Sequence, residues 1–163
     1  MKNAVLRNPA VVVSLMLATG GVVPAATAAD LHSHEGAGSQ ALELNAGRKW
    51  ATDAPLRKGT TEIRNAIARD KAAIHAGKLS EAGYNGLAKK IDTQVAYIVT
   101  NCKLPPEADA QLHLVLADIM QGSSAMKGKE SGVTRQAGAE KIIGALDAYG
   151  RHFEHPGWKR LAH

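Results

Sequence analysis

The feature that most constrains the fold is a long run of apolar residues at helical spacing in the middle of the chain. Between residues 84 and 102, apolar side chains recur at steps of three and four, which places them on one face of an α-helix. The members of this stripe are Tyr84, Leu87, Ile91, Val95, Ile98 and Cys102. Ser80 can cap this helix, and Pro105 and Pro106 follow it as a turn. Such a helix needs partners to cover its apolar face.

Three further segments show the same spacing, between residues 52 and 77, 107 and 127, and 134 and 156. Their expected inward-facing residues are Leu56, Thr60, Ile63, Ile67 and Ile74, then Leu112, Val115, Leu116, Ile119 and Met120, then Ile142, Ile143, Leu146, Tyr149 and Phe153. No segment alternates with a period of two, so the pattern predicts no strand. Four helices with short connections predict an all-α protein, an antiparallel up-down-up-down four-helix bundle over residues 50–158.

The first 29 residues have the three parts of a secretory signal peptide. Lys2 and Arg7 supply positive charge, residues 10–17 form an apolar run too short to span a membrane comfortably, and small residues surround a cut after Ala28 or Ala29. We therefore expect residues 1–29 to be removed on export and residues 30–49 to form a flexible, histidine-containing tail. Residues 159–163 are expected to be a short C-terminal tail. The mature protein is predicted to be periplasmic or secreted, without a membrane span.

The charge balance argues against a nucleic-acid partner. The chain has 20 Lys and Arg residues and 15 Asp and Glu residues, and loss of Lys2 and Arg7 leaves 18 basic residues. These are spread along the helices, which indicates a solvated surface. Because Cys102 is the only cysteine, no internal disulfide can form, and the core must stabilise the fold alone.

An up-down bundle would gather most of the aromatic residues at one pole. The first and third helices begin there, and the second and fourth end there. The residues that this arrangement brings to the pole are Trp50, Tyr97, Cys102, Tyr149, His152, Phe153, His155 and Trp158. They predict either a plug of large side chains that seals the bundle or an aromatic-walled pocket. The plug is the simpler interpretation, because aromatic side chains bury large apolar areas.

The first and last helices carry a family resemblance. The residues concerned are Thr60, Ile63 and Ile67 in the first, and Ala148, Tyr149, Gly150, Arg151, His152 and Phe153 in the last. They resemble the corresponding helices of the soluble four-helix periplasmic cytochromes, of the cytochrome b and cytochrome c prime type. The resemblance implies this bundle fold, and in that family a methionine early in the first helix and a histidine late in the last hold haem at this pole.

The present chain departs from that family at the haem ligands. The matching positions hold Thr60 and Gly150, and His152 lies two residues further on, about 200° around the helix. The sequence also lacks the Cys-x-x-Cys-His motif that attaches haem covalently. Ordinary six-coordinate haem is therefore not expected.

The N-terminal tail holds the strongest local indication of metal binding. If the signal peptide is cut after Ala29, His32 is the third residue of the mature chain. Its imidazole, the free amine and two backbone amides then form a square-planar four-nitrogen site suited to Cu(II) or Ni(II). A cut after Ala28 removes that chelate but leaves His32 and His34 as donors. The competing interpretation is a mobile tail with incidental histidines.

A second candidate metal site lies at the aromatic pole. Cys102 with His152, His155 or His113 would form a soft site for copper or zinc. In the competing interpretation, Cys102 is a small buried apolar residue at the end of its stripe, which is the commoner role of a free cysteine. Similarly, His113 with Asp109 is typical of a surface contact on a helix.

These observations favour an exported four-helix protein that binds a transition metal, copper first, in metal handling or stress. One alternative is a haem-binding electron carrier with non-standard ligation by His152. Another is a non-catalytic partner-binding module, for which a homodimer is one form. The sequence contains no nucleophile elbow, paired carboxylates, phosphate loop or metalloprotease helix, and we expect no catalysis.

Overall fold

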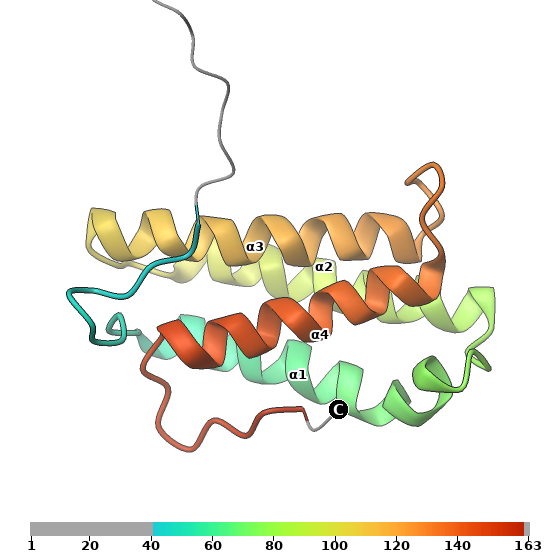
Figure 1. Ribbon diagram of the computed structural model, residues 1–163, viewed down its shortest axis with the longest axis horizontal. Helices are drawn as coiled ribbons and strands as arrows, with labels where there is room; N and C mark the ends of the chain where they lie inside the picture. The colour runs from blue at the N-terminus through green and yellow to red at the C-terminus, as the bar shows by residue number, and fades with distance from the viewer. Residues whose placement is uncertain (1–40, 162–163) are drawn as a thin grey trace, which may run out of the picture. The chain divides into compact units, whose positions relative to one another are not determined.

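Four α-helices make up most of the computed structural model, which describes residues 41–161. They are α1 (Ala54–His75), α2 (Glu81–Asn101), α3 (Pro106–Met126) and α4 (Arg135–His152). Each helix runs antiparallel to the one before it (Figure 1), and each packs against its two neighbours around the bundle. This confirms the predicted all-α four-helix fold. The predicted signal peptide and the first part of the predicted tail lie outside the described residues.

Three of the helices begin at a side-chain cap, and for α2 the cap is the predicted Ser80. The Asp53 carboxylate accepts a hydrogen bond from the backbone N–H of Leu56 at 2.8 Å, at the start of α1. Ser80 and Thr134 cap α2 and α4 in the same way, each accepting a backbone N–H at 3.1 Å. These bonds satisfy N–H groups that have no partner within the helix. By contrast, α3 has no side-chain cap and begins at Pro106.

The buried residues follow the predicted stripes closely. Ile63, Ile98, Ile119, Ile142 and the other main members are almost completely shielded from solvent. Cys102 is only partly buried, and Met120 is 56% exposed. It lies next to Ile119 in sequence, about 100° around the helix, and α3 turns only the Ile119 side toward the core.

The backbones of α3 and α4 approach closely at two glycines. A Cβ atom on Gly138 would lie 2.6 Å from the carbonyl oxygen of Gly122 and 2.8 Å from the Cβ of Ala125. Any larger residue at position 138 would therefore push the two helices apart. These helices share the most extensive contact in the bundle, whereas α1 and α4 share the least extensive contact between neighbours.

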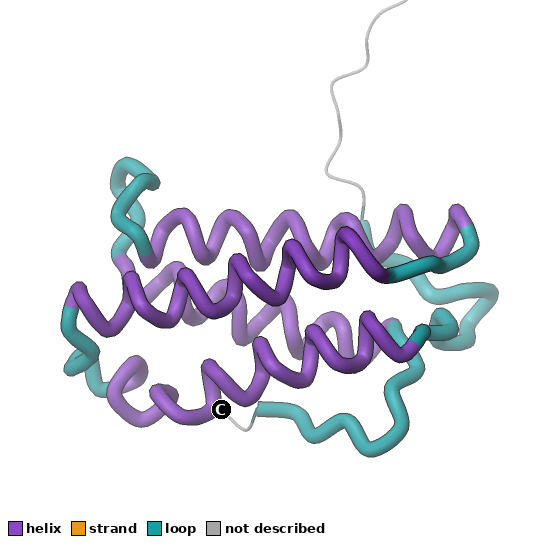
Figure 2. The backbone as a smooth tube through the Cα atoms, turned by 180° about the vertical axis from the view of Figure 1, so that it is seen from behind, coloured by secondary structure: helices purple, strands orange, loops and turns teal. Residues whose placement is uncertain are grey.

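Two non-helical segments pack at the pole where α1 begins and α4 ends. Residues 41–53 and 153–161 surround this end, as the tube in Figure 2 shows. The backbone N–H of Trp50 donates to the carbonyl of His152, and the N–H of Glu154 donates to the carbonyl of Trp50, both at 2.8 Å. Leu42 packs against the core, and Leu161 is buried.

The ends of the packed region therefore differ from the sequence-based boundaries. The sequence predicts a flexible tail over residues 30–49 and a C-terminal tail over residues 159–163, yet residues 41–49 and 159–161 lie against the bundle. No helix among residues 41–161 is both long enough and apolar enough to cross a membrane.

Candidate functional site

The aromatic pole is filled by side chains from α4 and the segment that follows it. Tyr149 and Phe153 are fully buried, and their rings stack with centroids 5.2 Å apart. Trp158 meets the edge of Tyr149 at 4.9 Å. It lies so close to Gly150 that a Cβ there would be 2.7 Å from Trp158 Cδ1. The rings thus form a plug, and the glycine leaves room for the indole.

His155 lies at the edge of this plug, held by a tyrosine. Its Nδ1 is 2.9 Å from the Tyr149 hydroxyl, and its Nε2 is 3.5 Å from Thr61 Oγ1. Burial raises the pKa of Tyr149 to about 12, so the phenol keeps its proton. We infer that it donates to Nδ1, which places the imidazole proton on Nε2. Burial, with a smaller effect of Arg57, lowers the pKa of His155 and favours the neutral ring.

A single carboxylate joins the start of α1 to the end of α2. Asp53 caps α1 and also accepts the backbone N–H of Lys103 at 2.6 Å and the Cys102 thiol at 3.4 Å. Burial opposes ionisation of Asp53, but the hydrogen bonds from Lys103 and Leu56 bring its pKa below the ordinary value. Burial, then Asp53, raises the pKa of Cys102 to about 12. Cys102 is therefore a protonated thiol, which is a poor nucleophile and a poor metal ligand.

The structure does not assemble Cys102, His152 and His155 into a metal site. Cys102 contacts Asp53, and His155 contacts Tyr149. The His152 Nδ1 lies 2.8 Å from the carbonyl of Ala148, one turn back on its own helix. Within residues 41–161, no group of three or more His, Cys, Asp or Glu side chains is placed to hold a metal ion.

The other predicted ligands lie elsewhere. His113 is exposed on α3, with Nδ1 3.3 Å from the Asp109 carboxylate, as expected for a surface contact. His32 and His34 lie outside the described residues.

The positions that match the family's haem ligands hold residues with other roles. Thr60 is fully buried, and its hydroxyl donates to the carbonyl of Leu56 at 2.8 Å. Gly150 lies against the indole of Trp158, which occupies the adjacent space. These residues do not fit a haem ligated from the first and last helices.

Sequence reasoning missed two surface pockets on either side of His155. The larger, of about 830 Å³, is lined by Arg48, Lys49, Glu154 and His155, among others. The smaller, of about 200 Å³, is lined by Arg64, His155 and Lys159, among others. The larger is built from irregular segments and the smaller from an irregular segment and α1, so helical spacing gave no sign of them. The adjacent Arg48 and Lys49 were the available signal.

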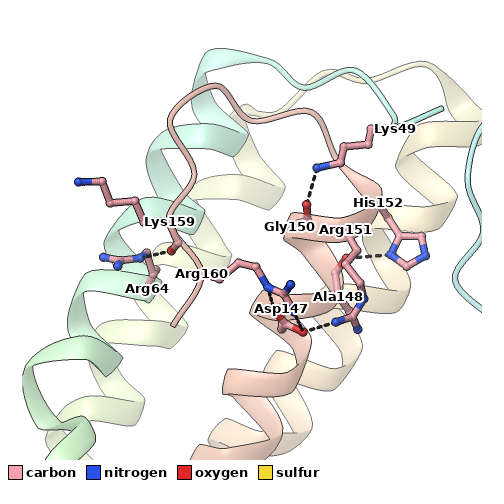
Figure 3. Close-up of polar contacts among 9 residues, drawn as sticks. All are labelled: Lys49, Arg64, Asp147, Ala148, Gly150, Arg151, His152, Lys159 and Arg160. Atoms are coloured by element: carbon pink, nitrogen blue, oxygen red, sulfur yellow. Dashed lines mark hydrogen bonds and ion pairs between the residues drawn. The ribbon is translucent and has the colours of Figure 1, made fainter. Parts of the chain in front are cut away.

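A polar frame fixes the segments that line these pockets (Figure 3). The Lys49 ammonium donates to the carbonyl of Gly150 at 2.7 Å, and Arg64 Nε donates to the carbonyl of Lys159 at 2.6 Å. Asp147, on α4, accepts from Arg160 Nε at 2.5 Å and also pairs with Arg151. The hydrogen bond from Arg160, followed by the charges of both arginines, lowers the pKa of Asp147.

No family model, curated protein or solved structure matches this chain.

Proposed function

We propose that this protein is a non-catalytic metal-binding protein outside the cytoplasm, which takes a transition-metal ion, copper first, on His32 and His34. The observation that carries the proposal is the position of these two histidines directly after the predicted cleavage site. Cleavage after Ala29 would create the amine, amide and imidazole donors that suit Cu(II), and cleavage after Ala28 would leave a His-Ser-His pair.

The bundle supports this assignment because two of its own candidate ligands already form hydrogen bonds within the protein. Cys102 donates to Asp53 and is a protonated thiol, while His155 is bonded to Tyr149. Metal binding at the pole would have to break these contacts. It would also open a plug of buried aromatic rings, whose burial contributes to stability.

The test uses protein exported with its own leader and characterised by N-terminal sequencing. Cu(II), Cu(I), Zn(II) and Ni(II) are titrated calorimetrically into the parent and into the H32A/H34A variant. The matched control is H75A/H113A, which also removes two imidazoles, both from exposed positions on the helices. We expect H32A/H34A to weaken Cu(II) binding at least about 100-fold and the control to change it less than about twofold.

Two results would overturn the proposal. One is the absence of uptake of all four ions below about 1 mM by the correctly processed parent. The other is equal weakening in H32A/H34A and H75A/H113A, which would indicate non-specific binding by surface histidines. The visible spectrum of the Cu(II) complex adds a geometric readout, because square-planar nitrogen coordination gives a characteristic ligand-field band.

A further inference from the structure

The two pockets beside His155 are lined by four cationic side chains from distant parts of the sequence. Arg48 and Lys49 line the larger pocket, and Arg64 and Lys159 line the smaller. We call these four residues the cationic rim. Among the described residues that line either pocket, Glu154 is the one carboxylate. Folding therefore gathers basic residues that appear scattered in the sequence.

The cationic rim has no carboxylate partner within residues 41–161. Lys49 and Arg64 donate to backbone carbonyl oxygens, of Gly150 and Lys159. The side chains of Arg48 and Lys159 form no hydrogen bond or ion pair with another described residue, and Figure 3 shows the Lys159 ammonium directed away from the residues around it.

Some other cations on the bundle are paired with carboxylates. Lys127 lies 2.7 Å from Asp92, and Lys141 lies 2.8 Å from Asp118. Close to the rim, Asp147 forms ion pairs with both Arg151 and Arg160. In the two pockets, four cationic side chains face one carboxylate, so the local charge is positive.

The backbone holds Arg48 and Lys49 in place without a ligand. Asn45 and Arg48 exchange two backbone hydrogen bonds of 2.8 and 2.9 Å across a tight turn. At its centre Ala46 and Gly47 have φ angles of 48° and 80°, and the first is uncommon for a residue with a side chain. Next to this turn, Trp50 is paired with His152 through its backbone. The loop is therefore preorganised, which reduces the entropy lost when a ligand binds.

We propose that the cationic rim binds a multivalent oxyanion, a small molecule with at least two phosphate groups, one on each side of His155. On one side Arg48 offers a planar fork of donors that matches phosphate oxygens. On the other side Arg64 bonds to Lys159 and Asn65 through Nε and Nη1, and its Nη2 offers the remaining donors. A lysine on each side, Lys49 or Lys159, supplies a point charge. Phosphate groups would also relieve the mutual repulsion of the four cations. The proposal uses no residue of the proposed N-terminal metal site.

The test titrates inorganic tripolyphosphate into the processed protein at low salt, with a chelator present so that bound metal makes no contribution. Binding is followed by calorimetry and by amide NMR shifts. We expect saturable binding, largest shifts around residues 45–50 and 154–160, and affinity at least about tenfold higher than for inorganic phosphate.

The decisive variant is R48A/K159A, which removes one cation from each pocket and breaks no contact to another described residue. Its matched control is K89A/K90A, which removes the same charge from exposed positions on α2. The rim variant should weaken tripolyphosphate binding at least about tenfold, and the control less than about twofold.

Three results would overturn the proposal: no saturable binding below about 1 mM, equal weakening in both double variants, or citrate binding as tightly as tripolyphosphate. The H32A/H34A variant separates the two proposals, because it should lose copper binding and keep tripolyphosphate binding.

Discussion

Ile98 and Gly59 provide a quantitative test of the packing between α1 and α2 near the pole. Ile98 is fully buried, and a Cβ atom on Gly59 would lie 2.8 Å from its Cδ1. Truncation of Ile98 to alanine removes a buried side chain and leaves a cavity, which should lower the free energy of unfolding by about 2–5 kcal/mol. Gly59→Ala should lower it by about 1–3 kcal/mol through overpacking, offset by about 1 kcal/mol of improved helix propensity.

The double variant G59A/I98A should lose less free energy of unfolding than the two single variants lose in sum. The new methyl group at position 59 enters the space that the shortened side chain leaves, so overpacking is relieved and the cavity shrinks. We expect a coupling free energy of about 1–3 kcal/mol in favour of the double variant. Equilibrium denaturation followed by far-UV circular dichroism measures all four proteins of this cycle.

Gly86→Ala on α2 is the control, because a Cβ there meets nothing within 4 Å and the residue is exposed. It should stabilise the protein by up to about 1 kcal/mol through propensity alone. The reasoning would be refuted if G59A stabilised the protein as much as G86A, or if the two effects at positions 59 and 98 added within about 0.5 kcal/mol.

Two further predictions follow from the pole. At mildly alkaline pH, iodoacetamide should modify Cys102 much more slowly in the folded than in the unfolded protein, because burial and then Asp53 raise the pKa of its thiol to about 12. Asp53→Asn keeps an oxygen to cap α1 and removes the negative charge, so it should accelerate alkylation; an unchanged rate would contradict the role of Asp53. For His155, burial and then Arg57 lower the folded-state pKa below 6.5, so the unfolded state binds more protons in this range. The free energy of unfolding should therefore fall as the pH drops below about 6.5, and H155N should lose that part of the slope. Identical slopes in parent and variant would show that His155 does not contribute.

The helices could be predicted because their information is local and periodic. Ser80 caps α2 as predicted, and Thr60 occupies its expected place in the first stripe. Met120 was expected to face inward but is exposed, because the apolar spacing of one helix does not show how wide its buried face is. Neighbouring helices set that width, and their arrangement is not written in the spacing of one helix.

The site could be predicted only as a place. The topology placed Cys102 and His155 at the same pole. It could not show that the Asp53 carboxylate accepts a hydrogen bond from the Cys102 thiol, or that the Tyr149 hydroxyl bonds to the His155 imidazole. The cationic rim was missed for a related reason. Lys49 and Gly150 meet across a sequence separation of 101 residues, and Arg64 and Lys159 meet across 95.

The segment after α4 has a consequence for how the bundle opens. Residues 158–161 bond to α1 through the carbonyl of Lys159 and to α4 through Arg160. They thus connect the two neighbouring helices that share the least contact with each other. The bundle therefore consists of two helical hairpins, α1–α2 and α3–α4, and the last residues connect the hairpins where α1 lies beside α4. Truncation of the chain before Trp158 would remove these connecting contacts, so hydrogen exchange should quicken first in the amides of α1 and α4 that face each other.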